Sequence, residues 1–594
     1  MADKTARERA EEFLRISDQF RLGELVTEGS HPVTANLSEV AREDTAAALD
    51  LLFRVDGDVV EKYREWVESG RSEEIAGVVT DALLAGGRIF FTGCGATGRL
   101  SILLDSIWRD FWQRTRPKFR KDWESRTVSI MAGGDYALIK SVEGFEDISA
   151  FGRRQIAEHN VGPRDVVFAI TEGGETSWVI GTAWEALDRG AKVYFVYNNP
   201  DDVLCKHVQR SREVIEEPRI EKINLTTGPM AITGSSRMQA TSIQLCVMLT
   251  VMEMALAEML NRENAKERKR ETEGVPLEFL AEMEEIYATL RSERVLTELA
   301  KLVELEEGVY RGGGKANYFA EALALDVLTD TTERSPTFCT PPFRKFDDLA
   351  ASESWVYLFT RPESSEDAWR RMLKREPRAV EWTRDQLAEF VPPNDIERLH
   401  EVIERISPAE IHKFKIGLEG LEYRRLSEND AVVDIVASRD RGFADRVAEA
   451  RAVGAKAAIA RIGGIGLSVQ SADVTVEVPL PESQFLLDPM THIAAKLLLN
   501  ALSTCVMVRL GRVMGNYMIC VAPSNLKLID RATRYISKLA DMPYEDACRL
   551  LFEVIEYVEP RMETNQAYPP VVGMAVMRAK CGVSNQEAEA RGGW

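Results

Sequence analysis

Short apolar runs alternate with amphipathic stretches through the first half of the chain. Runs rich in β-branched and aromatic residues lie at 88–92, 127–131, 165–170 and 192–197. Patterns with helical spacing follow at 98–114, 150–159 and 177–189. Strands that alternate with helices in this way predict a doubly wound parallel sheet with helices on both faces. We therefore expect ligands to bind beyond the carboxyl ends of the strands.

The second half of the chain repeats this alternation less clearly. Strands are predicted at 308–311, 355–360, 431–438 and 456–461, a glycine loop at 312–315, and helices at 316–330 and 441–453. Long apolar helices are predicted at 235–263 and 488–511, in matching places of the two halves. The pattern therefore predicts two copies of one α/β fold.

Shifts in composition divide the chain into four parts. A dense run of mixed charges after residue 262 is typical of a solvated helix end or a linker. From residue 515 onward, short amphipathic helices follow one another to the end. We predict an N-terminal helical segment at 1–55, a first α/β domain at 56–270, a second at 271–514, and a helical cap or lid at 515–594.

The charge balance narrows the choice of partners. The formal net charge is −20, which argues against a nucleic-acid backbone or an anionic membrane as the main partner. Charged residues interrupt the two most apolar helices, so we expect these to be core helices rather than membrane spans. A small anionic ligand in a locally positive pocket is compatible with this composition.

Cysteine and histidine usage indicates the compartment. The eight cysteines are scattered and contain no Cys-x-x-Cys pair, as expected for free thiols in a reducing cytoplasm. The chain starts without the apolar run of a signal peptide. The six histidines show no metal-ligand spacing. We therefore expect a cytoplasmic protein without a metal or cofactor.

A glycine-rich segment follows the first predicted strand. Gly93, Gly95 and Gly98 separate that strand from a helical pattern, in the order strand, tight loop, helix N-terminus. Such a junction points backbone N–H groups at an anion, and the helix dipole favours negative charge there. Many strand-to-helix turns carry glycine for steric reasons alone, so this pattern is a weak signal by itself. Thr97 would contact a phosphate or, alternatively, cap the helix.

Five segments together resemble one family of proteins. They are Leu25-Val-Thr-Glu-Gly-Ser-His-Pro-Val-Thr, Gly93-Cys-Gly-Ala-Thr-Gly-Arg-Leu, Ala132-Gly-Gly-Asp with Val142-Glu-Gly-Phe-Glu-Asp, Thr233-Gly-Ser-Ser-Arg-Met-Gln-Ala-Thr, and Asn500-Ala-Leu-Ser-Thr through Val513-Met-Gly-Asn to Ser524-Asn-Leu-Lys-Leu. In this order they resemble the sugar isomerase (SIS) domain proteins, and within them the N-acetylmuramic acid 6-phosphate etherases and the glucokinase regulatory protein. The resemblance implies two flavodoxin-like SIS domains in tandem under a helical cap. An etherase has one SIS domain per subunit and a site that a partner subunit completes.

The resemblance also implies which residues form the site. Phosphate- or sugar-binding residues would be Gly95, Thr97, Gly98, Gly174, Thr176, Ser177, Ser235, Ser236, Arg237, Asn525 and Lys527. Glu143 would touch the sugar hydroxyls and, in an etherase, act as the catalytic base at the carbon next to the carbonyl. The ligand would be a hexose or amino-sugar 6-phosphate.

Two departures from the family pattern bear on activity. Elimination of an ether needs a base and an acid, and this chain has Ile107 where the etherases carry the acid. Asp105 lies two residues away, which turns it roughly 200° around a helix. In the second loop Glu172 and Glu175 bring negative charge near a bound phosphate, unless they point away or hold a metal or a cationic sugar.

These features favour a phosphosugar-binding sensor or regulator, which would have a sugar kinase as its partner. The first alternative is an etherase-like lyase with Glu143 as base and Asp105 or a water as acid. The second alternative is a phosphosugar isomerase. We expect a monomer or a dimer, and the glycine loop at 312–315 is the one hint of a second site.

Overall fold

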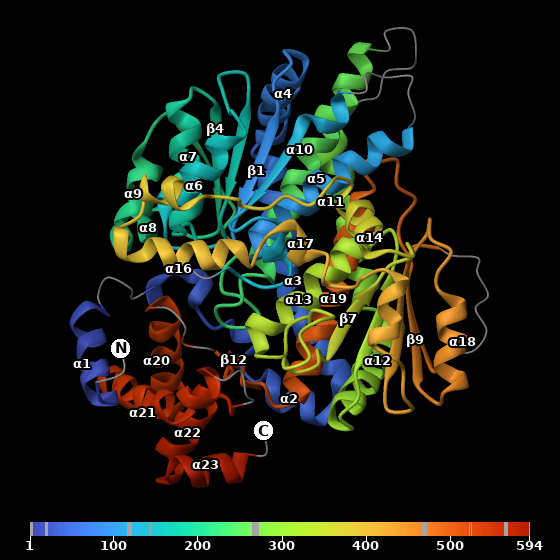
Figure 1. The fold of residues 1–594 in the computed structure, drawn as a ribbon. Coiled ribbons are helices and arrows are strands. Elements are labelled where there is room, and N and C mark those ends of the chain that lie inside the picture. The colour runs from blue at the N-terminus through green and yellow to red at the C-terminus, as the bar shows by residue number, and fades with distance from the viewer. Residues whose placement is uncertain are drawn as a thin grey trace.

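The structure is a computed structural model. It describes residues 4–17, 22–115, 122–142, 144–263, 272–464, 472–521, 523, 526–563 and 568–592. Two parallel sheets lie side by side with helices around them, and a group of C-terminal helices packs below the first sheet (Figure 1). This arrangement confirms the predicted class of two α/β units with a helical C-terminal part.

The first sheet has five parallel strands in the order β2-β1-β3-β4-β5, the flavodoxin-like order. Its strands are β1 (Ile89–Gly93), β2 (Thr127–Met131), β3 (Val166–Ile170), β4 (Lys192–Tyr197) and β5 (Ile220–Asn224). Every residue of β1, β2 and β3 is buried, because helices cover both faces. Those helices are α4 (Arg71–Leu84), α5 (Ala96–Thr115), α6 (Ser149–Glu158), α7 (Ser177–Asp188), α8 (Asp201–His207), α9 (Gln209–Glu216) and α10 (Gln239–Glu263).

The second sheet repeats this topology in the order β10-β9-β8-β6-β7. Its strands are β6 (Ala316–Ala320), β7 (Val356–Phe359), β8 (Ala431–Ala437), β9 (Lys456–Ile462) and β10 (Val474–Val478). The helices of this half are α11 (Val275–Leu290), α12 (Glu293–Arg311), α13 (Ala324–Phe338), α14 (Ser365–Leu373), α15 (Arg384–Ala388), α16 (Pro393–Glu404), α17 (Pro408–Ile411), α18 (Ala444–Ala452) and α19 (Pro489–Arg509). The prediction of two copies of one fold is confirmed, because strands taken in chain order occupy the same positions in both sheets.

The start of the second sheet differs from the prediction. Residues 308–311 end helix α12, 316–320 form strand β6, and helix α13 begins only at Ala324. The glycine loop at 312–315 therefore precedes its strand and lies at the amino end of the sheet. Gly314 serves close packing there, since a Cβ would lie 1.9 Å from the carbonyl oxygen of Asn429. The amino end is not the edge of the sheet where the fold places a ligand, so the indication of a second ligand site that we took from this loop was wrong.

Helices α10 and α19 form the core between the two sheets and contact each other and α3 (Thr45–Glu68). Both are long and apolar enough to cross a membrane, but 89% and 94% of their most apolar windows are buried inside the protein. This burial agrees with the prediction of core helices.

The C-terminal helices pack on the N-terminal segment beside the first sheet (Figure 1). They are α20 (Leu526–Ala540), α21 (Tyr544–Glu563), α22 (Val571–Cys581) and α23 (Asn585–Gly592), and the hairpin β11 (Val513–Met514) and β12 (Tyr517–Met518) precedes them. The N-terminal segment has the helices α1 (Ala6–Ile16) and α2 (Leu37–Glu43) and the 3₁₀ turns η2 (Leu22–Glu24), η3 (Val26–Glu28) and η4 (Pro32–Thr34). Turns η5 (Trp123–Arg126), η6 (Asp135–Leu138) and η7 (Leu418–Tyr423) complete the elements. The division into four parts and its three boundaries remain a prediction.

Candidate functional site

A cavity of about 380 Å³ opens beyond the carboxyl ends of β1 and β3. The loops after these strands, the segment before α10, helix α13 and the cap helix α20 line it. Its charged lining residues are Glu28, Arg99, Glu146, Glu172, Glu175, Arg237, Glu333, Lys527 and Arg531. The cavity lies where the fold places a ligand, and parts of the chain far apart in sequence complete it.

The glycine loop after β1 forms one wall. Gly95 lines the cavity with a φ of +57°, a conformation that favours glycine. Gly98 packs on β2, because a Cβ would lie 2.5 Å from Met131. Thr97 is fully buried, and its hydroxyl bonds the backbone N–H and carbonyl of Cys94 at 3.1 and 2.9 Å. Thr97 therefore fixes the loop, and Gly95 faces the cavity.

The loop after β3 forms the second wall. Thr176 lines the cavity, and its hydroxyl lies 3.1 Å from the hydroxyl of Thr171. Ser177 is the first residue of α7, so its backbone belongs to a helix N-terminus. Gly174 has a φ of +85° and packs against Leu204 rather than lining the cavity.

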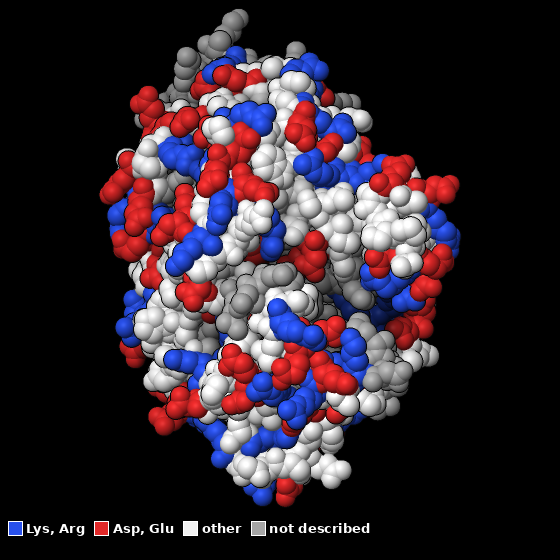
Figure 2. All heavy atoms as spheres, turned by 90° about the vertical axis from the view of Figure 1, so that its left-hand side faces the viewer, with Lys and Arg blue, Asp and Glu red and all other residues white. Residues whose placement is uncertain are grey.

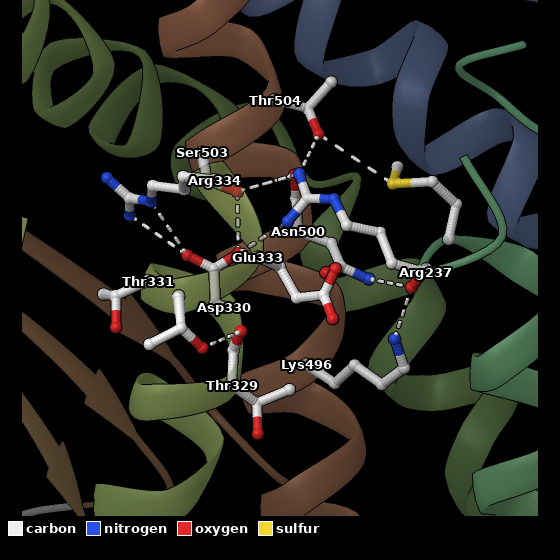
Figure 3. A network of polar contacts seen from close by, with 12 residues as sticks. Arg237, Thr329, Asp330, Thr331, Glu333, Arg334, Lys496, Asn500, Ser503 and Thr504 are labelled. Atoms are coloured by element: carbon white, nitrogen blue, oxygen red, sulfur yellow. Dashed lines mark hydrogen bonds and ion pairs between the residues drawn. The ribbon is translucent and has the colours of Figure 1, made fainter. Parts of the chain in front are cut away.

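The segment before α10 forms the third wall. Ser235 and Ser236 line the cavity, and Gly234 lies so close to the cap that a Cβ would be 2.5 Å from the hydroxyl of Tyr535. Arg237 is 5% exposed, and its guanidinium bonds Asp330 at 3.2 Å and Thr504 at 2.9 Å (Figure 3). Two residues from the second half of the chain, Asp330 and Thr504, thus hold an arginine that lines the cavity.

Helix α20 supplies two cations to the cavity. Lys527 is ion-paired with Glu175 and lies 3.7 Å from Glu146. Burial disfavours its charge, but these two carboxylates hold the pKa of Lys527 above its ordinary value. Burial would raise the pKa of Glu28, yet Arg531 at 2.5 Å and the neighbouring Arg534 together lower it to about 2. The cap is therefore held to the N-terminal segment by ion pairs.

Two of the predicted site residues, Glu143 and Asn525, lie outside the described residues. Ile107 is buried in the core. Asp105 is 1% exposed and bonds Arg109 at 2.8 Å and Thr127 at 2.7 Å instead of lining the cavity. This placement removes Asp105 as a candidate acid.

Five charged cavity residues escaped the sequence analysis: Glu28, Arg99, Glu146, Glu333 and Arg531. Glu28 lies within the N-terminal family segment and Arg99 within the glycine segment, but nothing in either pattern marked them as facing a ligand. Arg531 follows Lys527 by one helical turn, a spacing that would have indicated the same face of a helix.

One face of the molecule shows how charge is distributed over part of its surface. On the face shown in Figure 2, positive and negative residues are mixed, without one continuous patch of either sign. Among the described residues, no group of three or more His, Cys, Asp or Glu side chains is arranged to hold a metal ion. The cations that line the cavity are Arg99, Arg237, Lys527 and Arg531.

In the second α/β half, a side chain of the protein itself occupies the position that corresponds to the cavity of the first half. Ala322 follows β6 as Gly95 follows β1, and its N–H donates to the carboxylate of Asp440 at 3.1 Å. The N–H of Ala437, at the end of β8, donates to the same carboxylate at 3.1 Å. Asp440 thus occupies the place that a bound anion would take in this half.

The fold and the cavity define a tandem SIS-domain protein. Residues 72–186 match the family described as glucokinase regulatory protein N-terminal SIS domain. A stretch of 235 residues is 31% identical to N-acetylmuramic acid 6-phosphate etherase of Clostridioides difficile (strain 630), and the match covers 39% of this chain and 69% of that relative. The chain belongs to the N-acetylmuramic acid 6-phosphate etherase family, which confirms the resemblance seen in the sequence.

A longer match extends this relationship. It is 28% identical over 324 residues to the etherase of Rubrobacter xylanophilus (strain DSM 9941), and covers 93% of that relative but 53% of this chain. Almost half of this chain therefore lies outside the match to this relative. Among solved structures, the C-terminal domain of glucosamine-fructose-6-phosphate aminotransferase from Francisella tularensis aligns over 79% of this chain and 97% of its own, with a TM-score of 0.42 and 10% identity.

Proposed function

We propose that the chain binds a hexose or amino-sugar phosphate in the 380 Å³ cavity, as a cytoplasmic sensor or regulator. The observation that carries the proposal is the meeting of Lys527 and Arg531 of the cap with Gly95 and Ser235 of the first α/β half. Backbone amides at helix starts, hydroxyls and cations are the groups that bind phosphate. A regulator of this kind would act on a sugar kinase.

The family's lyase reaction is the alternative, and the cavity offers one specific feature in its favour. Position 107 is isoleucine and Asp105 faces away, so neither supplies an acid. Burial raises the pKa of Glu172, which lines the cavity, to about 7. A carboxyl group with such a pKa is suited to proton transfer at neutral pH. A phosphosugar isomerase with Glu143 as its base is the second alternative.

Two measurements on the purified protein test these functions. Calorimetric titration should detect binding of hexose 6-phosphates and no binding of the same sugars without phosphate. Incubation with N-acetylmuramic acid 6-phosphate should release no D-lactate if the protein is a regulator. Release that disappears in Glu143→Ala would favour the lyase, and absence of binding by every phosphosugar would refute the proposal.

Lys527→Ala is expected to weaken phosphosugar binding by at least about 1–3 kcal/mol, the usual loss for a charge-assisted hydrogen bond. The loss includes a repulsive part, because Glu175 would then face the phosphate without its partner. Adding Glu175→Ala to the Lys527 variant should restore part of the affinity. Unchanged affinity of the single variant would remove Lys527 from the site.

We expect one phosphosugar to bind per chain. The carboxylate of Asp440 already accepts the N–H groups of Ala322 and Ala437, and a second anion there would meet like charge. The stoichiometry from calorimetry measures this directly. A value of two per chain would show that the second half has its own site.

A further inference from the structure

We propose that the sugar phosphate recognised by this cavity carries a free amine, and that the carboxylate of Glu172 binds the ammonium. This inference rests on the proposed function, because it names the class of sugar bound at the same site. Glu172 is the second residue after strand β3 and lines the cavity next to Thr176 and Gly173. It would be a specificity-determining residue.

The first argument is the charge that the cavity already holds. Its described lining contains five carboxylates and four cations. Each of these cations already has a carboxylate partner: Lys527 pairs with Glu175, Arg531 with Glu28, Arg99 with Glu333 at 2.7 Å, and Arg237 with Asp330. A sugar phosphate adds nearly two negative charges at neutral pH. A ligand without positive charge would leave the cavity with a large excess of negative charge.

The second argument is that Glu172 alone among the five lining carboxylates has no cation within ion-pair distance. No hydrogen bond or ion pair joins its side chain to another described residue, although Glu28, Glu146, Glu175 and Glu333 each have a cation within ion-pair distance. Lys527 attracts its charge from beyond ion-pair distance, and the nearby carboxylates of Glu175 and Glu333 repel it. An ammonium group at this position would pair with the one carboxylate of the described cavity lining that has no cation within ion-pair distance.

A third observation comes from Glu175, on the same loop. This residue is 4% exposed and lines the cavity, and its Oε1 is bound to Lys527. Its Oε2 accepts no hydrogen bond from any described residue. A buried carboxylate oxygen without a donor is costly, so it favours a ligand that brings N–H groups. An ammonium carries three such donors, and a hydroxyl carries one.

The phosphate and the amine would both bind beside the loop after β3. Lys527 meets Glu175 from the cap, and a phosphate there would compete with that carboxylate for the lysine. Glu175 released from Lys527 would then join Glu172 in facing the ammonium. A ligand with both a phosphate and an ammonium group would thereby pair with Lys527 and with the two glutamates. A sugar phosphate without an amine would leave these two carboxylates in repulsion.

The test compares three hexose 6-phosphates that differ at carbon 2 by calorimetry: glucosamine 6-phosphate, glucose 6-phosphate and N-acetylglucosamine 6-phosphate. We expect the free amine to bind at least about tenfold more tightly than the other two, as a charge-assisted hydrogen bond allows. In Glu172→Gln this preference should fall to within about twofold, and glucose 6-phosphate should bind as tightly as before or more tightly. Glu146→Gln removes the same charge from the same cavity, so it is the matched control and should shift the affinities of all three sugars alike.

A second readout, the number of protons released on binding, does not depend on affinity. Because burial holds the pKa of Glu172 at about 7, pairing with an ammonium should release protons at pH 7, and the binding heat should vary with the ionisation heat of the buffer. Glucose 6-phosphate should release fewer protons, and Glu172→Gln should abolish the difference. Equal affinity for amine and hydroxyl sugars, or a preference that survives in Glu172→Gln, would overturn the inference while leaving phosphosugar binding intact. Failure of all three sugars to bind would refute the proposed function and the inference with it.

Discussion

Replacing Arg334 by methionine is expected to destabilise the second α/β half by about 3–5 kcal/mol. Arg334 is fully buried, and its guanidinium bonds Glu306 at 2.6 Å, Asp330 at 3.0 Å and the hydroxyl of Tyr318 at 3.1 Å. Methionine fills a similar volume but leaves two buried carboxylates without this cation. Removing one partner of a buried ion pair costs far more than removing an exposed one, because the remaining charge is not solvated.

The measurement is the midpoint of urea unfolding, followed by tryptophan fluorescence. The matched control is Arg384→Met, because Arg384 pairs with Glu397 at 2.7 Å while the two side chains are 53% and 65% exposed. Water screens the charges of an exposed pair, so this variant should unfold close to the wild type. Equal midpoints for the two variants would show that the buried network does not stabilise the fold.

The Arg334 network also reaches the candidate site. Asp330 binds Arg334 on one side and Arg237 on the other, so one carboxylate holds an arginine of the second half and an arginine of the ligand cavity (Figure 3). Ser503 adds a hydrogen bond to Asp330 at 2.7 Å. A change in Arg334 should therefore weaken phosphosugar binding as well as stability.

Hydrophobic periodicity predicted four of the five strands of the first sheet and missed β5 (Ile220–Asn224). Each of the four predicted strands of the first half is found within a residue of its predicted position, because buried parallel strands are continuous apolar runs between polar turns. It failed at 308–320, where the end of helix α12 carries Val309 and Tyr310. These residues have strand propensity, but they extend the buried face of a helix, so tertiary packing decided their conformation.

The site could be predicted only as far as local sequence determines it. Gly95, Thr176, Ser235, Ser236, Arg237 and Lys527 were expected together and do line one cavity. The ion pair between Lys527 and Glu175 joins residues 352 positions apart, and no local pattern carries that information. The role of Thr97 could not be predicted, because it depends on the direction of the side chain: its hydroxyl bonds the backbone of Cys94, and Thr97 does not line the cavity.

Acidification is expected to release the cap through Glu28. The pKa of this carboxyl is about 2 in the folded protein, against an ordinary value of 4.5, because Arg531 and Arg534 outweigh its burial. A lowered pKa means that the unfolded chain binds the proton more tightly, so the contribution to stability is complete above about pH 5 and is lost as the pH falls toward 2. The difference in pKa corresponds to about 3 kcal/mol.

Glu28→Gln should remove this contribution at neutral pH. The stability of the variant should then depend less on pH in the acid range. Glutamine keeps the size of the side chain but leaves Arg531 without its partner. Thermal unfolding midpoints at pH 7, 5 and 3 should show the variant well below the wild type at pH 7, with a gap that narrows at pH 3. Glu397→Gln changes an exposed carboxylate and should follow the wild type throughout. A gap that stays constant from pH 7 to 3 would show that Glu28 acts by packing rather than by its charge, and that the cap is not held by this ion pair.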